Sequence, residues 1–506
     1  MLNFYIYLVV IVGGASVLAV ELLGTRIIAP FYGAGLYLWT AQISVALAAL
    51  SVGYAIGGRW ADKGARLERL ALLLGLAGVW IALIPLMRTP ALIISEAAGL
   101  RTAVLITSAV LFFPPLTLLG MVSPYAIRLK ASSIDVVGRT AGNLYSVSTV
   151  ASVFAAIATG FFLIPSIGVT RFLLLIGFSL IATSMLGLLM AKQRNSIAQA
   201  VALAVAFLGS SLIAPDLKAN PDRGLIDIRQ SAYGEIRVVE VDEVRYMVLD
   251  GGIHTIINPY TLESLFPYVN VLDIPKRMFA QPADMLLVGL GGGSVVKSYQ
   301  RDGWKVDAVE IDPEVVQVAY DHFGLKPSDA QVFAMDARRH FLTHDKQYPL
   351  IILDAFGSSA IPFHLVTKEA FALTKSRLTS DGVLAMNIEA VGWDDTVVKS
   401  LSATLATIFT HVTTLPIAEP PDQLGNLIIL ASDRRLELLE EMTTPTDRFS
   451  AEYDRAHAWD NRFAVKPEWG PVLTDDLNLV DIWAERVNLV AREDLHAFFK
   501  DRGLAW

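Results

Sequence analysis

Three acidic residues stand where carboxylates commonly do chemistry, each at the end of an apolar segment: Glu310, Asp336 and Asp354. A carboxylate in such a place can accept a proton or bind hydroxyl and amino groups. The alternative role for Asp336 and Asp354 is to cap the start of a helix. Function is favoured over capping for both. It is favoured most for Asp354, because the following Gly357-Ser-Ser-Ala-Ile-Pro362 is typical of a loop.

A glycine-rich loop precedes the first of these acids. Met285–Val288 is an apolar run that predicts a buried strand, Ser294–Gln300 predicts a helix, and Gly289, Gly291, Gly292 and Gly293 lie between them. Glu310 stands near the end of a second predicted strand, 21 positions after Gly289. In the nucleoside-binding half of a Rossmann-like sheet, such glycines let the backbone approach the ligand and the acid binds the ribose hydroxyls. NAD is less favoured, because Ser294 occupies the third glycine position of its motif.

The elements around these residues predict an α/β domain with a parallel sheet. Strands are expected near 285–288, 305–311, 331–335, 349–354, 382–387 and 426–431, with helices between them. Asp336 follows the third strand and Asp354 ends the fourth. Because such a sheet binds ligands at the carboxyl ends of its strands, Asp336 can meet the adenine amino group, and Asp354 lies beside the expected reactive centre.

The remaining segments complete the expected domain organisation. A β-hairpin is predicted from Gly234–Val241 and Val244–Leu249, with a turn at Asp242-Glu243. The predicted parts are a transmembrane domain of about seven helices (1–214), a linker and β-rich subdomain (215–283), a Rossmann-like, methyltransferase-type domain (284–445) and a tail with a helix (446–506).

The chain is too apolar for an ordinary soluble protein, with 54% hydrophobic residues and a mean hydropathy of +0.49. Seven segments approach the roughly 20 residues that a bilayer core requires. They are Phe4–Leu23, Leu36–Ala61, Leu70–Met87, Thr102–Ile127, Ala141–Ile164, Phe172–Ala191 and Ile197–Ala214. The first is not a signal peptide, because it lacks a basic start and six more segments follow.

Charge divides the two halves. Residues 1–214 carry a net charge of +8 and the remainder −16, which gives the overall −8. The acidic half argues against nucleic acid as a partner and mildly favours small cationic substrates, although acidity can equally serve solubility alone. No cysteine is present, which excludes disulfides and thiolate chemistry. No metal is expected, because the spacing of His340 and His344 lacks the glutamate of a zinc motif and lies among basic residues.

Basic residues predict the orientation in the membrane. The loops after the second, fourth and sixth segments, with the segment ends beside them, carry nine of them: Arg59, Lys63, Arg66, Arg69, Arg128, Lys130, Arg139, Lys192 and Arg194. The loops after the first, third and fifth carry four: Arg26, Arg88, Arg101 and Arg171. The amino terminus is therefore expected inside. Seven spans would place the α/β domain outside, whereas an intracellular nucleoside ligand requires it inside. The cytoplasmic side is weakly favoured.

Residues 224–435 resemble the polyamine aminopropyltransferase (spermidine synthase) family. The motifs are Ser231-Ala-Tyr233, Arg245–Gly251, the glycine-rich loop, Val309-Glu-Ile-Asp312, Asp336-Ala337 and the strand ending in Asp354. A narrower resemblance is to the membrane-fused bacterial branch of this family. It rests on Asp354-Ala-Phe356, Ile361–Phe371, Leu473-Thr-Asp-Asp476, Glu21–Arg26, Ala29-Pro30, Gly57–Asp62 and Ser123-Pro124.

The resemblance implies transfer of an aminopropyl group from decarboxylated S-adenosylmethionine, a cosubstrate and not a permanently bound cofactor, to putrescine or a related amine. It implies that Asp354 is the catalytic proton acceptor. The implied cosubstrate-binding residues are Gly289, Gly291, Gly293, Glu310, Asp336 and Ala337, and the implied substrate-binding residues are Tyr233, Asp250 and Glu263. The expected location is the bacterial inner membrane, with the lipid bilayer as a partner. A homodimer is also compatible with the sequence.

Four positions depart from the family pattern. Gly234 replaces a glutamine, Gly292 replaces an acid in the glycine-rich loop, Tyr260-Thr-Leu-Glu263 replaces Tyr-His-Glu, and Gly357 replaces the second acid of Asp-x-x-Asp. In the family these positions hold the aminopropyl ammonium and the diamine. Two alternatives therefore stay open. One is a methyltransferase or lyase acting on intact S-adenosylmethionine, and the other is a membrane polyamine transporter or sensor that binds without turnover.

Two features of the membrane half are candidates for function. Gly57-Gly-Arg-Trp-Ala-Asp-Lys63 resembles a cytoplasmic loop of major-facilitator transporters, but close helix packing with basic anchoring explains it equally well. Glu21 lies near the end of the first apolar segment, where an unpaired charge is unfavourable. Pairing with Arg26 is the simple alternative.

Overall fold

The computed structural model describes residues 1–506 except 34, 96–97, 132, 192–194, 214–218, 356–360, 418–420, 467, 469 and 502–506. The chain forms two compact units. Unit 1 comprises Met1–Lys218 and Gln230–Gly234, and unit 2 comprises Ala219–Arg229 and Glu235–Trp506.

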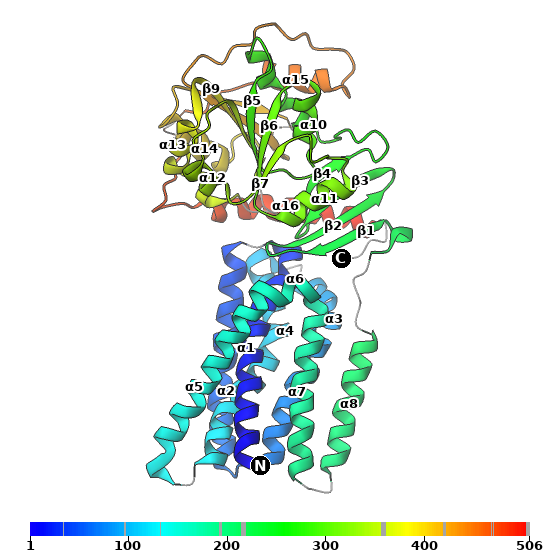
Figure 1. Ribbon diagram of the computed structural model, residues 1–506, viewed down its shortest axis with the longest axis vertical. Helices are drawn as coiled ribbons and strands as arrows, with labels where there is room; N and C mark the ends of the chain where they lie inside the picture. Colours follow the sequence, from blue (N-terminus) through cyan, green and yellow to red (C-terminus); the bar gives the residue numbers. More distant parts are fainter. Residues whose placement is uncertain are drawn as a thin grey trace. The chain divides into compact units, whose positions relative to one another are not determined.

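Unit 1 is built from helices that run alongside one another (Figure 1). They are α1 (Leu2–Tyr32), α2 (Leu36–Asp62), α3 (Leu67–Ser95), α4 (Leu100–Lys130), η2 (Ile134–Val136), α5 (Val137–Ala158), the π-helical η3 (Thr159–Leu163), α6 (Ile164–Ile167), α7 (Val169–Ala191) and α8 (Ser196–Ile213). Within the described residues, six helices are long and apolar enough to cross a membrane. The prediction of a multi-pass helical domain is confirmed. The seventh predicted segment corresponds to α8, whose 18 residues make it shorter than each of these six helices.

Glycines allow the helices of unit 1 to approach closely. A Cβ atom on Gly53 of α2 would lie 2.4 Å from the carbonyl oxygen of Thr117 in α4, and one on Gly57 would lie 2.6 Å from the Cα of Met121. Such close backbone contact favours helix association in lipid, where the hydrophobic effect does not drive it. Helix packing therefore accounts for Gly57 in the segment that resembles a transporter loop.

Helix α8 packs against α3 and α7. Ala200 and Leu203 of α8 share one apolar cluster with Ala71 of α3 and with Ile181 and Leu188 of α7. Because α8 follows α7 after a short connection, the two helices form an antiparallel pair. An 18-residue helix is about 27 Å long.

Unit 2 begins with a four-stranded antiparallel sheet in the order β1-β2-β3-β4. Its strands are β1 (Leu225–Gln230), β2 (Glu235–Val241), β3 (Val244–Leu249) and β4 (Gly252–Ile257). The predicted hairpin is formed by β2 and β3. Its turn residues Asp242 and Glu243 have φ angles of 53° and 61°, as a two-residue hairpin turn of the primed type requires.

The second sheet has seven strands in the order β10-β11-β9-β8-β5-β6-β7. Its strands are β5 (Asp284–Val288), β6 (Lys305–Glu310), β7 (Gln331–Ala334), β8 (Tyr348–Leu353), β9 (Leu378–Val391), β10 (His411–Pro416) and β11 (Leu424–Ser432). The Rossmann-like, methyltransferase-type prediction is confirmed. The expectation of a purely parallel sheet was wrong, because β11 pairs antiparallel with both β9 and β10. The sequence did not reveal β10, whose half-polar residues lack the apolar run of a buried strand.

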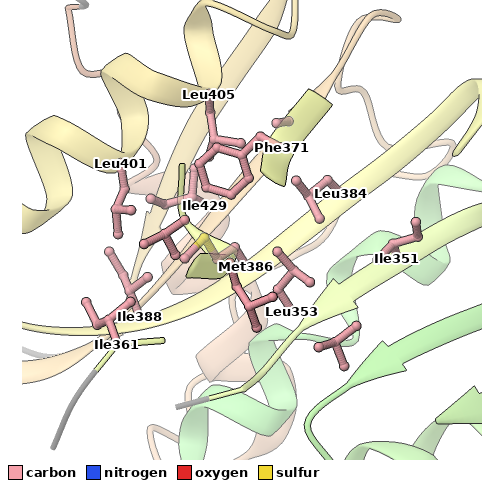
Figure 2. Packing of buried hydrophobic residues seen from close by; sticks show 14 of the residues in the cluster. Ile351, Leu353, Ile361, Phe371, Leu384, Met386, Ile388, Leu401, Leu405 and Ile429 are labelled. Carbon is pink, nitrogen blue, oxygen red and sulfur yellow. The ribbon is translucent and has the colours of Figure 1, made fainter. Parts of the chain in front are cut away.

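Helices cover both faces of this sheet. One face packs against α12 (Ala337–Thr343), α13 (Lys368–Ser376), α14 (Thr396–Ala406) and α16 (Val480–Asp501). The other packs against α9 (Pro267–Val271), α10 (Ser294–Arg301), α11 (Pro313–His322) and α15 (Ala451–Asp460). The short helices η4 (Pro221–Arg223), η5 (Ile274–Met278) and η6 (Phe363–Leu365) complete the unit. Figure 2 shows the first core, where Phe371 and Leu405 meet Leu384 and Met386 of β9 and Ile429 of β11.

Candidate active site

The glycine-rich loop follows β5. The order of the strands reverses at β5, because β6 lies on one side of it and β8 on the other. Ligands of such sheets bind outside the carboxyl ends of the strands at this switch point. Gly289 has a φ of +89°, and a Cβ atom there would lie 2.1 Å from the carbonyl oxygen of Asp354. Only glycine allows the loop after β5 to pass so close to the end of β8. Gly291 and Gly293 also have positive φ, and Gly293 precedes α10 directly.

Glu310 lies against this loop, as the sequence predicted. Its Oε2 accepts a hydrogen bond from the backbone N–H of Leu290 at 2.9 Å, and its Oε1 accepts one from Asp312 at 3.0 Å. Burial raises the pKa of Glu310, and the two N–H donors oppose this effect by stabilising the carboxylate. Each oxygen retains a lone pair that a ribose hydroxyl could use. Binding of ribose by Glu310 stays a prediction.

Asp336 does cap a helix. Its Oδ1 accepts the backbone N–H of Arg339 in the first turn of α12 at 2.9 Å. Its Oδ2 lies 2.8 Å from Nε2 of His364, a residue that the sequence analysis did not single out. The two alternatives for Asp336 are therefore not exclusive, since one oxygen caps while the other faces His364. Ala337, expected near the nucleobase, turns its side chain into the core beneath α12.

Asp354 projects toward the α9 face of the sheet. Because side chains alternate along a strand, Leu353 points into the core shown in Figure 2 and Asp354 to the opposite face. Asn387 Nδ2 donates to Asp354 Oδ1 at 2.8 Å, and the Tyr268 hydroxyl donates to Oδ2 at 3.3 Å. Burial raises the pKa of Asp354 to about 7, although both donors act in the opposite direction. This carboxyl group therefore changes its charge close to neutral pH.

A second carboxyl group lies on the same face. Glu389 follows Asn387 by two residues on β9, and burial raises its pKa to about 7. Burial also raises the pKa of Tyr268, and the nearby Asp354 and Glu389 raise it further, so the phenol stays protonated and can donate. Asn426 of β11 donates to Asn387 Oδ1 at 3.1 Å and fixes its amide.

The sequence analysis did not single out Tyr268, Asn387 or Glu389. The sequence did contain an indication of Asn387 and Glu389, because these polar residues interrupt a segment that is otherwise apolar from Val383 to Val391. Polar side chains with this spacing share one face of a strand. Nothing near Tyr268 in the sequence pointed to Asp354, 86 positions away.

Position 292 is closely packed. The N–H of Gly292 donates to Oγ1 of Thr255 in β4 at 2.8 Å. A Cβ atom on Gly292 would lie 2.7 Å from Cγ2 of Thr255 and 2.9 Å from the ring of Phe323. The missing acid therefore leaves no empty space, because Thr255 and Phe323 fill it.

The predicted substrate-binding residues Asp250 and Glu263 each have a partner within unit 2. Asp250 Oδ1 accepts the backbone N–H of Glu235 at 2.9 Å, within the β-rich sheet region. Glu263 is exposed and pairs with Arg301 at the carboxyl end of α10, the end remote from the glycine-rich loop. Tyr233, 51% exposed, lies in the segment 230–234, which is grouped with unit 1. Gly357 is outside the described residues. The substrate roles of Tyr233, Asp250 and Glu263 stay predictions.

No group of three or more potential metal ligands occurs among the residues that the structure describes. His340 is buried and stacks on His344, with ring centroids 4.2 Å apart. Burial lowers the pKa of His340 to about 4, so the ring is neutral at physiological pH.

Taken together, the fold and this cluster define a Rossmann-like domain with acidic residues at the carboxyl ends of its central strands. The C-terminal part of the chain is similar to polyamine aminopropyltransferases. The protein of that name from Vibrio vulnificus is 33% identical over 180 residues, which cover 34% of this chain and 58% of that protein. Polyamine aminopropyltransferase 1 of Aquifex aeolicus is 22% identical over 187 residues, 36% of this chain and 66% of that protein. The matched regions thus cover less than two thirds of these relatives.

Methyltransferases match as well. The eEF1A lysine and N-terminal methyltransferase of Mus musculus is 29% identical over 151 residues, 27% of this chain and 22% of that protein. Among solved structures, a probable spermidine synthase from Corynebacterium glutamicum aligns with 17% identity and a TM-score of 0.39, covering 45% of this chain and 86% of that one. Human Methyltransferase-like protein 13 in complex with SAH aligns with 24% identity and a TM-score of 0.29, covering 38% and 87%. No family model matches the chain.

Proposed function

We propose that unit 2 transfers an aminopropyl group from decarboxylated S-adenosylmethionine to putrescine or a related small amine. The observation that carries this proposal is the pair of carboxyl groups, Asp354 and Glu389, on one face of the sheet beside the glycine-rich loop. As carboxylates they can bind the two ammonium groups of a diamine, although burial raises the pKa of each to about 7. The similarity to polyamine aminopropyltransferases supports the proposal.

The proposed reaction needs a neutral amine. An amine with a pKa near 10 is only about one part in a thousand neutral at pH 7. Asp354, as a carboxylate, accepts a proton from the attacking nitrogen and holds it in line. A C–N bond forms at the carbon next to the sulfonium, the C–S bond breaks, and methylthioadenosine leaves. Asn387 and Tyr268 keep Asp354 oriented by donating to its two oxygens. Glu389 binds the distant ammonium group.

A second candidate is a reaction of intact S-adenosylmethionine, such as methyl transfer. The observation that favours it is position 292, where Thr255 and Phe323 stand in place of an acid that would repel the carboxylate of this cosubstrate. The similarity to methyltransferases points the same way.

Product analysis separates the two candidates. The purified full-length chain is incubated with putrescine and either decarboxylated or intact S-adenosylmethionine, and the products are identified by mass spectrometry. Spermidine with methylthioadenosine, formed only from the decarboxylated donor, is the expected result. Methylated amine with S-adenosylhomocysteine would instead establish the second candidate. The Asp354→Asn chain serves as the control for uncatalysed transfer.

We further propose that the chain is a multi-pass protein of the bacterial inner membrane with unit 2 on the cytoplasmic side. Six helices long enough to span return the chain to the side of Met1. The excess of basic residues in the loops on that side assigns it to the cytoplasm. The proposed cosubstrate is made there, which supports this orientation.

A further inference from the structure

Glu21 of α1 is an acidic residue within a membrane-spanning segment. It lies 11 residues before the end of α1 and makes no hydrogen bond or ion pair with the residues that the structure describes. The pairing with Arg26 that the sequence allowed is absent. Ionisable side chains inside membrane segments are unfavourable, and those that occur commonly line substrate or ion pathways.

A buried amide lies against α1 one helical turn from Glu21. Gln42 of α2 is 1% exposed, and neither its Nε2 nor its Oε1 has a hydrogen-bond partner among the described residues. Its side chain lies over Gly24, where a Cβ atom would be 2.1 Å from Nε2. Glu21 is one helical turn before Gly24 and therefore on the same side of α1, with side-chain origins about 5–6 Å apart. The absent side chain of Gly24 makes room for this amide.

A third polar group comes from the end of α5. The hydroxyl of Thr159 is fully buried and also lacks a partner among the described residues. Gly14 of α1 packs against Ser148 and Ser152 of α5, and both helices advance in the same direction. Two turns further along each helix, Glu21 is level with Thr159. Thr159 also begins the π-helical segment η3, which contacts α1. Such segments are frequent at functional sites.

We infer that Glu21, Gln42 and Thr159 form a binding site for a small protonated amine inside unit 1. A carboxylate, an amide oxygen and a hydroxyl are all acceptors, and an ammonium group has three donors to satisfy. One bound ammonium would thus pair the acid and fill acceptors that are otherwise buried without partners. This site goes beyond the reaction proposed for unit 2, and its role would be to transport or sense an amine.

Equilibrium binding of radiolabelled putrescine to the full-length chain in lipid nanodiscs tests the inference. The chain carries Asp354→Asn and Glu389→Gln throughout, which removes the amine contacts proposed in unit 2. Binding should persist in this background and fall at least roughly tenfold when Glu21→Gln is added, a change of ~1.4 kcal/mol. The matched control is Asp135→Asn, which removes the same charge from an exposed residue of η2 and should leave binding unchanged.

Two further variants guard against misfolding. Gln42→Leu and Thr159→Val keep the approximate shape of each side chain while removing the acceptor. Each variant should elute from size-exclusion chromatography at the same volume as the parent chain and should bind putrescine more weakly. Binding that is equal in Glu21→Gln and Asp135→Asn would overturn the inference. Displacement of putrescine by sodium at equal concentration would identify an inorganic cation site and would also overturn it. Because product formation tests unit 2 separately, failure of either proposal is recognisable by itself.

Discussion

Asp354 and Glu389 share an unusual property for carboxylic acids, since each changes its charge near pH 7. Burial opposes the charged form of Asp354, and its partners among the described residues are the neutral side chains of Asn387 and Tyr268. A cationic substrate would stabilise the carboxylate, so these surroundings favour the binding of an ammonium group. This argues for an amine as ligand independently of any similarity to known proteins.

Replacement of Asp354 by asparagine tests its role as proton acceptor. Asp354→Asn is nearly isosteric but cannot take the proton, so kcat should fall roughly 10²- to 10⁴-fold while nucleoside binding is retained. In the wild type the active form is the carboxylate, whose pKa is raised to about 7. The value of kcat/KM should therefore decrease as the pH falls from 8 to 5.

The pH profile of the variant provides the contrast. Residual activity of Asp354→Asn should keep only the part of this acidic limb that Glu389 contributes, since its pKa is also raised to about 7. A matched control is Asp345→Asn, whose side chain is 96% exposed and pairs only with Arg377 among the described residues. Unchanged turnover in Asp354→Asn would show that another group accepts the proton.

Glu310 is tested best by a substitution that spares the loop. Because Glu310 holds the N–H groups of Leu290 and Asp312, Glu310→Ala would disturb the backbone as well as remove the proposed ribose contact. Glu310→Gln keeps the size of the side chain and one acceptor. Wild type should bind methylthioadenosine at least tenfold more tightly than its 2′-deoxy analogue, a difference of ~1.4 kcal/mol.

The variant should lose most of this preference, as measured by calorimetry with both ligands. Equal preference in wild type and Glu310→Gln would remove Glu310 from the ribose site, even if overall affinity declines. The comparison of two ligands on one protein separates a lost contact from a distorted loop.

At the scale of elements, the contact between β4 and the glycine-rich loop affects the choice of cosubstrate. An acid at position 292 would disfavour the carboxylate of intact S-adenosylmethionine. Gly292→Asp alone would collide with Thr255 and Phe323, so the test requires space as well as charge. Thr255→Ser removes the Cγ2 methyl and keeps the hydroxyl that Gly292 contacts. The ring of Phe323, 2.9 Å from the new Cβ atom, then has to shift to accommodate the side chain.

The double variant Gly292→Asp with Thr255→Ser should therefore shift preference toward the decarboxylated donor by roughly tenfold, about 1.4 kcal/mol. Competition between the two donors, measured as the ratio of their kcat/KM values, provides the readout. Thr255→Ser alone is the control and should leave the ratio unchanged. If the wild type already rejects the intact donor as fully as the double variant, position 292 does not select the donor.

A second contact between elements explains a motif for which the sequence offered no chemistry. Asp475, within Leu473–Asp476, pairs with Arg338 of α12 and accepts a hydrogen bond from Thr367 at 2.7 Å. Asn478 donates to the carbonyl of Phe363 at 2.8 Å. The tail thus holds the segment Phe363–Thr367, in which His364 contacts Asp336.

At the scale of the whole molecule, the side of the membrane that unit 2 faces depends on α8. This helix is shorter than the six others, yet it packs along α3 and α7. Its length of about 27 Å is close to the thickness of a bilayer core. If α8 ends within the membrane without crossing it, unit 2 lies on the side of Met1.

A reporter fused after Trp506 decides the matter. We expect green fluorescence and no alkaline phosphatase activity, because the proposed cosubstrate requires a cytoplasmic domain. A fusion after residue 192, before α8, is the matched control and should behave in the same way. Phosphatase activity after Trp506 alone would show that α8 crosses as a seventh span, and the cytoplasmic orientation would be wrong.

Local patterns in the sequence determined the elements and their kinds. Apolar length predicted the helices of unit 1, and the strand, glycine loop and acid spacing predicted the Rossmann-like sheet and placed Glu310 beside Leu290. These features depend on residues close together in the chain, where periodicity and turn chemistry act directly. The hairpin at Asp242-Glu243 was predictable for the same reason.

Only the tertiary structure brought Tyr268, Asn387 and Glu389 to Asp354 and showed that Thr255 fills the space at Gly292. It also set the buried amide of Gln42 in α2 over Gly24 of α1, one helical turn from Glu21. The order of the strands and the register between helices decide which distant side chains meet. The burial that raises the pKa of Asp354 arises from atoms on several elements at once. No spacing along one chain specifies such convergence, because it is a property of the packed structure.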